Sequence, residues 1–277
     1  QVGTQIPLEV LLKGMIVQSG NDATIAVAEK VGGTEQAFAG IMNSYAKQLG
    51  MKNSNFENSS GLPGPTHRMS ARDIATLAHA MIAEFPEYYR WYALREFEWN
   101  GIKQQNRNGL LGRDPSVDGI KTGHTESAGY CLATSAERNG MRLISAVLGT
   151  KSMKAREDAS AALLNYGYTF YETVALKKKG DVLLSPRVYK GEVEMIPAVV
   201  ARDVWATVPR GSAASLVTTT SLNEPLIAPL TAAQTIGQVS ITDGTATVAS
   251  APLVPQQAVA EGGWWSQLSD TVSLWMR

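Results

Sequence analysis

A lysine, a threonine and a glycine follow one another in residues 117–130, V-D-G-I-K-T-G-H-T-E-S-A-G-Y, inside an expected β-strand. Lys121 brings a positive charge, Thr122 brings a hydroxyl, and Gly123 leaves room for another backbone to come close. A second group, Ser19-Gly20-Asn21, places a hydroxyl and a carboxamide at an expected tight turn between two helices. These side chains are of the kinds that bind polar ligands and transfer protons.

Each group also has a purely structural interpretation. S-G-N can be a helix-capping turn, with Asn21 or Ser19 as the cap of the following helix, and K-T-G can be an ordinary strand end. Short tripeptides arise often by chance, so either group alone favours the structural interpretation. Only the combination, in this order along the chain, carries information about function.

The first half of the chain alternates helical and strand patterns, which must position these groups. Apolar spacing predicts helices from Pro7, from Asp22 to Gly32, and from Thr34 to Gly50. Ser70 and Asp73 form a pair like a capping box ahead of a further helix. Two strand-like runs flank R-N-G, which predicts a hairpin directly after the strand of Lys121, and a helix follows over about residues 153–168.

From Thr173 to about Val254 the sequence changes to short Val- and Thr-rich runs, prolines and turns such as D-G. This pattern predicts a separate small β domain. We therefore place domains at residues 1–172 and 173–260, with a terminal segment at residues 261–277.

The terminal segment is predicted to be an amphipathic helix after Gly262-Gly263. Its apolar side is expected to hold Trp264, Trp265, Leu268, Val272, Trp275 and Met276, and its polar side Ser266, Gln267, Ser269, Asp270 and Ser273. Tryptophan and leucine on one side favour a helix that lies in a lipid interface. The alternative is a terminal helix docked on its own protein. The polar side lacks lysines, which argues against strong binding to anionic lipid.

Composition excludes several classes of function. Twenty-five basic residues balance 25 acidic ones, so charge gives no indication of nucleic-acid binding. Cys131 is the single cysteine, and no metal-ligand spacing is present. No stretch of the sequence approaches the length needed to span a bilayer. The chain begins without an initiator Met, so we read its start as a processing or cloning boundary.

S-x-N followed by K-T-G matches the second and third motifs of penicillin-binding proteins and serine β-lactamases. Over nearly its whole length the chain resembles the low-molecular-mass penicillin-binding proteins that are D-alanyl-D-alanine carboxypeptidases. The segments that carry this resemblance are V-L-L-K-G-M-I-V-Q-S-G-N-D-A-T-I-A-V-A-E, L-G-M-K-N-S-N-F, Q-N-R-N-G-L-L, V-D-G-I-K-T-G-H-T, M-R-L-I-S-A-V-L-G, V-P-R-G, P-L-I-A-P-L and E-G-G-W-W.

The resemblance implies an α+β fold: a penicillin-binding, β-lactamase-like domain with an antiparallel sheet and helices, then a small β-sandwich-like domain and an amphipathic membrane-anchor helix. It also implies catalytic roles for Ser19, Asn21 and Lys121. Ser19 would join a proton relay to the leaving amine with help from Lys121, and Asn21 would hold the acyl-side peptide. A peptide would lie along the Lys121 strand as an added strand.

The same resemblance implies a substrate-binding set, which consists of Thr122, Gly123, His124, Arg107 and Arg156. Thr122 would offer its hydroxyl to the terminal carboxylate of the substrate. Arg156 would pair with that carboxylate, for which a bidentate geometry is suitable; its alternative is a solvated helix surface. His124 has no assigned proton-transfer role and can be a rim residue. Arg107 is expected near the cleft.

The family's nucleophile lies in an S-x-x-K motif that precedes S-x-N, but no such motif occurs in the eighteen residues before Ser19. Ser44-Tyr45-Ala46-Lys47 fits the letters, although it follows S-G-N instead of preceding it. We expect that the nucleophile segment is not part of this chain and that the chain alone is inactive. Whether another chain supplies that segment stays open.

The sequence thus predicts a serine-type D-Ala-D-Ala carboxypeptidase that trims peptidoglycan pentapeptides, binds β-lactams and needs neither metal nor organic cofactor. The expected location is the periplasm, on the outer face of the bacterial inner membrane, with roles in cell-wall synthesis and cell shape. One alternative is a serine β-lactamase, against which the β domain and the tryptophan-rich tail argue. A second alternative is a catalytically inactive cell-wall binding module.

Overall fold

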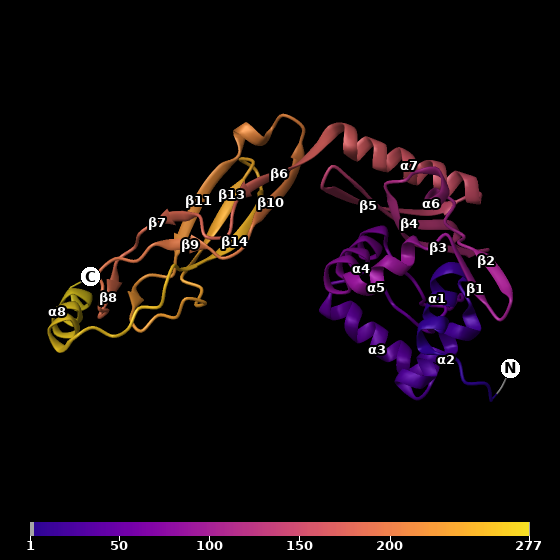
Figure 1. Ribbon diagram of the computed structural model, residues 1–277, viewed down its shortest axis with the longest axis horizontal. Coiled ribbons are helices and arrows are strands. Elements are labelled where there is room, and N and C mark those ends of the chain that lie inside the picture. The colour runs from indigo at the N-terminus through magenta and orange to yellow at the C-terminus, as the bar shows by residue number, and fades with distance from the viewer. Residues whose placement is uncertain (1–2, 277) are drawn as a thin grey trace. The chain divides into compact units, whose positions relative to one another are not determined.

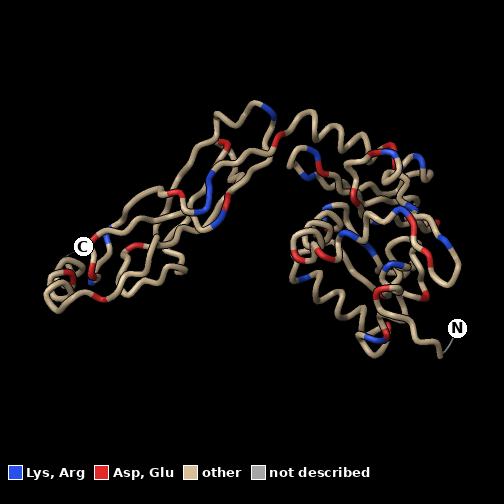
Figure 2. Tube along the Cα trace, in the orientation of Figure 1, with Lys and Arg blue, Asp and Glu red and all other residues tan. Residues whose placement is uncertain are grey.

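The computed structural model describes residues 3–276 and divides into two compact units between Tyr168 and Thr169 (Figure 1). The division falls in the last turn of a long helix, whereas the sequence places the domain boundary after residue 172. Figure 2 shows basic and acidic residues mixed along both units, without a long stretch of the trace in one colour.

The first unit contains most of the helices. Their bounds are α1 Leu8–Gln18, α2 Asn21–Gly32, α3 Glu35–Gln48, α4 Ala71–Glu84, α5 Pro86–Tyr89, the 3-10 helix η1 Arg90–Ala93, α6 Leu110–Arg113 and α7 Met153–Phe170. Two predicted helix starts are confirmed, because the Thr34 side chain accepts a hydrogen bond from the Ala37 N–H and Ser70 accepts one from the Asp73 N–H.

A three-stranded antiparallel sheet lies in this unit. Its order is β3 Val117–Thr125, β4 Gly129–Arg138 and β5 Met141–Thr150, so β3 is an edge strand. The predicted R-N-G hairpin is confirmed between β4 and β5: Asn139 and Gly140 both have positive φ, 52° and 77°. Two positive φ values in a row are the conformation that tight hairpins require. A separate hairpin joins β1 Glu96–Trp99 to β2 Ile102–Gln105.

Helices cover both faces of this sheet. Neighbouring residues of a strand point to opposite faces, so adjacent residues of β4 show what packs on each side. Leu132 packs in a buried cluster with Leu110 of α6 and Leu164 of α7. The next residue, Ala133, packs on the opposite cluster, which contains Ala78 of α4. The sheet is thereby held from both sides, and β3 keeps a defined position at its edge.

The second unit is built from short strands around one apolar core. Its five-stranded sheet has the order β11 Val217–Leu222, β13 Gly237–Thr242, β14 Thr247–Pro255, β9 Ala198–Val200 and β7 Val182–Leu184. The unit also contains two separate two-stranded sheets, β6 Tyr171–Lys177 with β10 Val204–Pro209 and β8 Val188–Tyr189 with β12 Leu226–Ile227. A 3-10 turn, η2, spans Ala213–Ser215. The predicted D-G turn lies between β13 and β14.

The predicted terminal helix is present as α8, Trp264–Trp275. It docks on its own unit through its polar side: Asp270 is 7% exposed, accepts a 2.9 Å bond from Arg187 Nη2, and also accepts from the Lys190 N–H. Its apolar side faces outward, with Trp265 67% and Trp275 89% exposed. Within residues 3–276, every helix is too short or too polar to cross a bilayer.

Candidate active site

The S-G-N segment joins α1 to α2 through a residue in the left-handed region. Ser19 has φ 58° and ψ 45°, and its N–H donates to Met15 O at 3.1 Å. The predicted cap was wrong: Gly20 occupies the cap position of α2 without a side-chain cap bond, and Asn21 is the first helical residue. Because Ser19 does not cap the helix, its hydroxyl is available to a partner across the cavity.

That partner is Lys121 of β3. Its Nζ donates a hydrogen bond to Ser19 Oγ and a second, 3.2 Å bond to Thr122 O. Burial, and to a smaller extent the nearby positive charges of Arg107 and Arg156, together lower the pKa of Lys121 to about 8. A lysine with this pKa can give up its proton near neutral pH, which an exposed lysine cannot do readily.

Arg156 of α7 is buried, with 3% of its surface exposed, so the alternative of a solvated helix surface was wrong. Its Nη2 donates to Arg107 O at 3.1 Å and its Nη1 to Gly123 O at 3.3 Å. Burial lowers the pKa of Arg156 from its ordinary value, although its charge is retained. Each Nη group keeps a second N–H beyond these bonds. Arg156 therefore ties the edge strand to the segment that carries Arg107.

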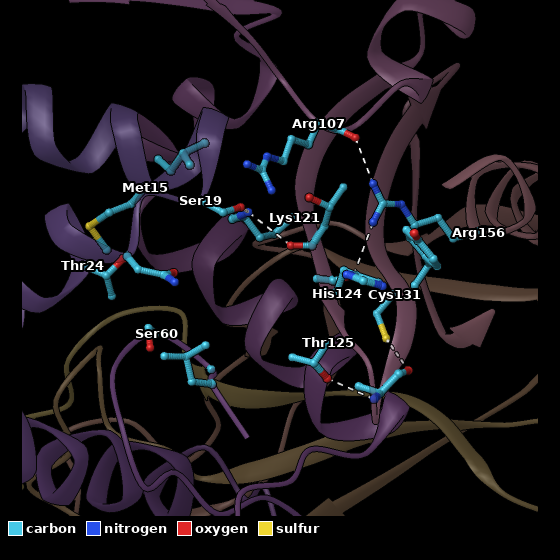
Figure 3. A pocket seen from close by; sticks show the side chains of 18 of the residues that line it. Met15, Ser19, Thr24, Ser60, Arg107, Lys121, His124, Thr125, Cys131 and Arg156 are labelled. Carbon is cyan, nitrogen blue, oxygen red and sulfur yellow. Dashed lines mark hydrogen bonds between the residues drawn. The ribbon is translucent and has the colours of Figure 1, made fainter. Parts of the chain in front are cut away.

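Unlike Arg156, Arg107 is exposed, and it contacts the end of α1. Its N–H donates to Val17 O at 3.4 Å and its Nε to Gln18 Oε1 at 3.2 Å. These bonds place its guanidinium beside the end of α1, near Ser19, where Figure 3 shows it on the rim above Lys121.

One cavity of about 770 Å³ brings these groups together (Figure 3). All of the residues selected from the sequence line it, namely Ser19, Asn21, Arg107, Lys121, Thr122, Gly123, His124 and Arg156. The structure places them in one site, and their individual roles stay predictions. Ser44 is not among the lining residues; it lies on α3, where its hydroxyl donates to Gly40 O at 3.0 Å.

Several lining residues were not foreseen, among them Met15, Ser59, Tyr92, Tyr130 and Cys131. The sequence did contain a signal for Tyr130: counting residues outward from the short connection between β3 and β4 places it directly opposite His124. Met15 and Tyr92 carry no sequence signal for a site, because helical apolar spacing explains both. Among residues 3–276, no group of three or more His, Cys, Asp and Glu side chains is arranged to hold a metal ion.

Comparison with known proteins identifies two matching family profiles. The profile described as D-alanyl-D-alanine carboxypeptidase matches residues 1–152, and that of the penicillin-binding protein 5 C-terminal domain matches residues 171–261. The D-alanyl-D-alanine carboxypeptidase DacA of Escherichia coli K12 is 42% identical over 274 residues, which is 98% of this chain and 68% of that protein.

Solved structures agree with these matches. Penicillin-binding protein 5 from Haemophilus influenzae superposes with a TM-score of 0.82 at 40% identity, over 93% of this chain and 76% of that one. Penicillin-binding protein D2 from Listeria monocytogenes, solved with cefotaxime bound, superposes with a TM-score of 0.56 at 31% identity, over 59% of this chain and 67% of that one.

Proposed function

Because the chain belongs to the D-alanyl-D-alanine carboxypeptidase family of penicillin-binding proteins, as its sequence predicted, we propose that it supplies most of the active site of an enzyme that removes the terminal D-Ala from peptidoglycan pentapeptides. The reaction proceeds through a serine acyl-enzyme, and β-lactams enter the same site. The observation that carries the proposal is the contact, in the cavity wall, of Lys121 Nζ from the edge strand β3 with Ser19 Oγ from the turn between α1 and α2.

The Ser19–Lys121 pair serves as the proton relay to the leaving amine. When the bond to the terminal D-Ala breaks, the amine nitrogen takes the hydroxyl proton of Ser19, and Lys121 replaces that proton from its ammonium group. A pKa of about 8 keeps Lys121 mostly protonated at pH 7 and able to donate without a large penalty. Ser19 therefore ends the step as a neutral hydroxyl.

The edge of β3 receives the peptide backbone. β3 pairs only with β4 in its sheet, and a Cβ atom added at Gly123 would meet nothing closer than Cys131 Cβ at 3.8 Å. An extended peptide can therefore approach Gly123 and extend the sheet. Its terminal carboxylate lies toward Thr122, where Arg107 and Arg156 provide positive charge.

The nucleophile is a serine of an S-x-x-K motif that lies outside these 277 residues, and the chain alone forms no acyl-enzyme. Support comes from Ser44, the first residue of the one matching tetrapeptide, whose hydroxyl bonds to its own helix and whose side chain is absent from the cavity lining. This chain spans about two thirds of the length of the E. coli relative.

We further propose that α8 lies in the surface of a membrane and that the protein works in the periplasm, on the outer face of the bacterial inner membrane. Its outward tryptophans and inward Asp270 support this orientation. The match to a penicillin-binding protein 5 C-terminal domain favours the carboxypeptidase over a β-lactamase.

The first experiment is the intact mass of the chain after incubation with a penicillin. We expect no adduct with the 277 residues and one drug mass with a form that is extended upstream to include an S-x-x-K motif. D-Ala release from a D-Ala-D-Ala peptide by the extended form, faster than its hydrolysis of the penicillin, supports the carboxypeptidase. An adduct on Ser19 or Ser44 of the shorter chain would contradict the assignment of the nucleophile. An extended form that binds peptidoglycan but takes up no drug would favour the inactive binding module.

A further inference from the structure

Tyr130, the second residue of β4, lies against two of the residues that line the cavity. Its ring centroid is 4.0 Å from that of His124, with the ring planes tilted by 33°. The guanidinium carbon of Arg156 lies 5.8 Å from the centroid of the same ring. Tyr130 also lines the cavity itself. One aromatic ring therefore contacts both an imidazole from β3 and a guanidinium from α7.

The backbone holds this ring in place independently of any ligand. Tyr130 is the partner of His124 across the β3–β4 pair, and on its other side Thr150 Oγ1 donates to Tyr130 O at 2.9 Å. The preceding Gly129 has φ 65°, and a Cβ atom there would come within 2.9 Å of Thr150 O. The start of β4 is thus fixed between its two neighbouring strands.

The contacts of Arg156 show what the ring adds. Its Nη groups bond to two backbone carbonyl oxygens, while its Nε has no hydrogen-bond partner among the described residues. The face of an aromatic ring attracts a cation, and the attraction strengthens where water is excluded. The contact between the two tilted rings likewise limits the rotation of the His124 side chain, which is otherwise exposed. Without the ring, the side chains of His124 and Arg156 each lose a contact that restricts their positions.

We propose that Tyr130 is a positioning residue for the carboxylate end of the cavity: its ring holds Arg156 and His124 in the arrangement that receives the terminal carboxylate of a D-Ala-D-Ala peptide. The proposal rests on the proposed function of this cavity. Tyr130 acts through its two neighbours and not by contact with the scissile bond. Its ring, and not its hydroxyl, carries the effect.

The test compares Tyr130→Leu, Tyr130→Phe and a matched control, Phe56→Leu. Phe56 makes an edge contact of 5.8 Å with His67, and neither residue lines the cavity. Binding to the chain is measured by NMR titration with an N-acylated D-Ala-D-Ala peptide and with the same peptide ending in an amide. In parallel, NMR relaxation measures the side-chain order parameters of His124 and Arg156 without ligand.

We expect Tyr130→Leu to weaken binding of the carboxylate peptide about tenfold, since a contact between two aromatic rings and a cation–π contact are each worth a few-fold. The amide peptide should change by less than twofold. Tyr130→Phe and Phe56→Leu should leave both affinities unchanged. Equal losses for the two peptides, or a loss with Tyr130→Phe as large as with Leu, would overturn the proposal.

The ligand-free spectra separate this proposal from the proposed function. If the wild-type chain binds neither peptide, the proposed use of the cavity fails, while the spectra still report on the positioning role. In that case side-chain order parameters of His124 and Arg156 that fall in Tyr130→Leu but not in Tyr130→Phe or Phe56→Leu uphold the positioning claim. Order parameters that are the same in all variants overturn it.

Discussion

Replacing Lys121 by methionine tests whether the lysine carries a buried charge. Burial is the largest cause of its lowered pKa, about 8 compared with 10.5 in the unfolded chain. The difference corresponds to a penalty of about 3 kcal/mol for holding the ammonium in the folded chain. Between these two pKa values the unfolded chain binds more protons than the folded chain, so stability rises with pH. The penalty is fully present below pH 8 and is relieved as the pH approaches 10.5.

The expected result is therefore an unusual one for a residue in an active site. Lys121→Met should be more stable than wild type at pH 7, by about 3 kcal/mol less about 1 kcal/mol for the lost bond to Ser19. At pH 10 the lysine is neutral in the folded chain but still about three quarters protonated in the unfolded chain, so the advantage should shrink by about 2.5 kcal/mol without disappearing.

Urea unfolding at pH 7 and pH 10, followed by circular dichroism at a helical wavelength, measures this difference, because helices α1 to α7 begin in the first unit. Lys47→Met, at an exposed position of α3, is the matched control and should show no such pH dependence. If the advantage of Lys121→Met changes by less than about 1 kcal/mol between the two pH values, Lys121 does not carry a buried charge and the proton-relay assignment loses its basis.

Three further predictions concern other parts of the chain. Gly119→Ala should lower the free energy of unfolding, measured by urea titration, by about 1–3 kcal/mol, because the added Cβ would come within 2.7 Å of Tyr89 Oη. Unchanged stability would show that the Tyr89 side chain can move away without cost. Asp270→Ala should speed proteolytic cleavage before α8, since it removes the hydrogen bonds that Asp270 accepts from Arg187 and from the Lys190 N–H. An unchanged cleavage rate would argue against docking of α8 by Asp270. Trp275→Ser should reduce sedimentation of the chain with lipid vesicles at least severalfold, because tryptophan favours the lipid interface. It should not lower the stability of the fold, because this side chain is 89% exposed. Equal sedimentation of variant and wild type would remove the support for a membrane role of α8.

Local patterns accounted for much of the fold. Thr34 and Ser70 cap their helices as predicted, because a capping bond needs only the next three residues. The R-N-G hairpin also formed as predicted, since Asn139 and Gly140 tolerate positive φ. The cap of α2 was wrong for a related reason: Ser19 itself adopts the left-handed region, and Gly20 takes the cap position. The tertiary contact of Ser19 with Lys121 accompanies the arrangement that is observed.

The sequence by itself determined the identities and order of the reactive groups, the strand that carries Lys121 and the amphipathic character of α8, because each depends on neighbouring residues or on a regular spacing. Only the tertiary structure brought Ser19 and Lys121, 102 residues apart, into contact. It also decided that Arg156 is buried against the β3 edge and that Tyr130 lies against it. Burial and the approach of like charges set the pKa of Lys121, and both arise only when distant segments pack together.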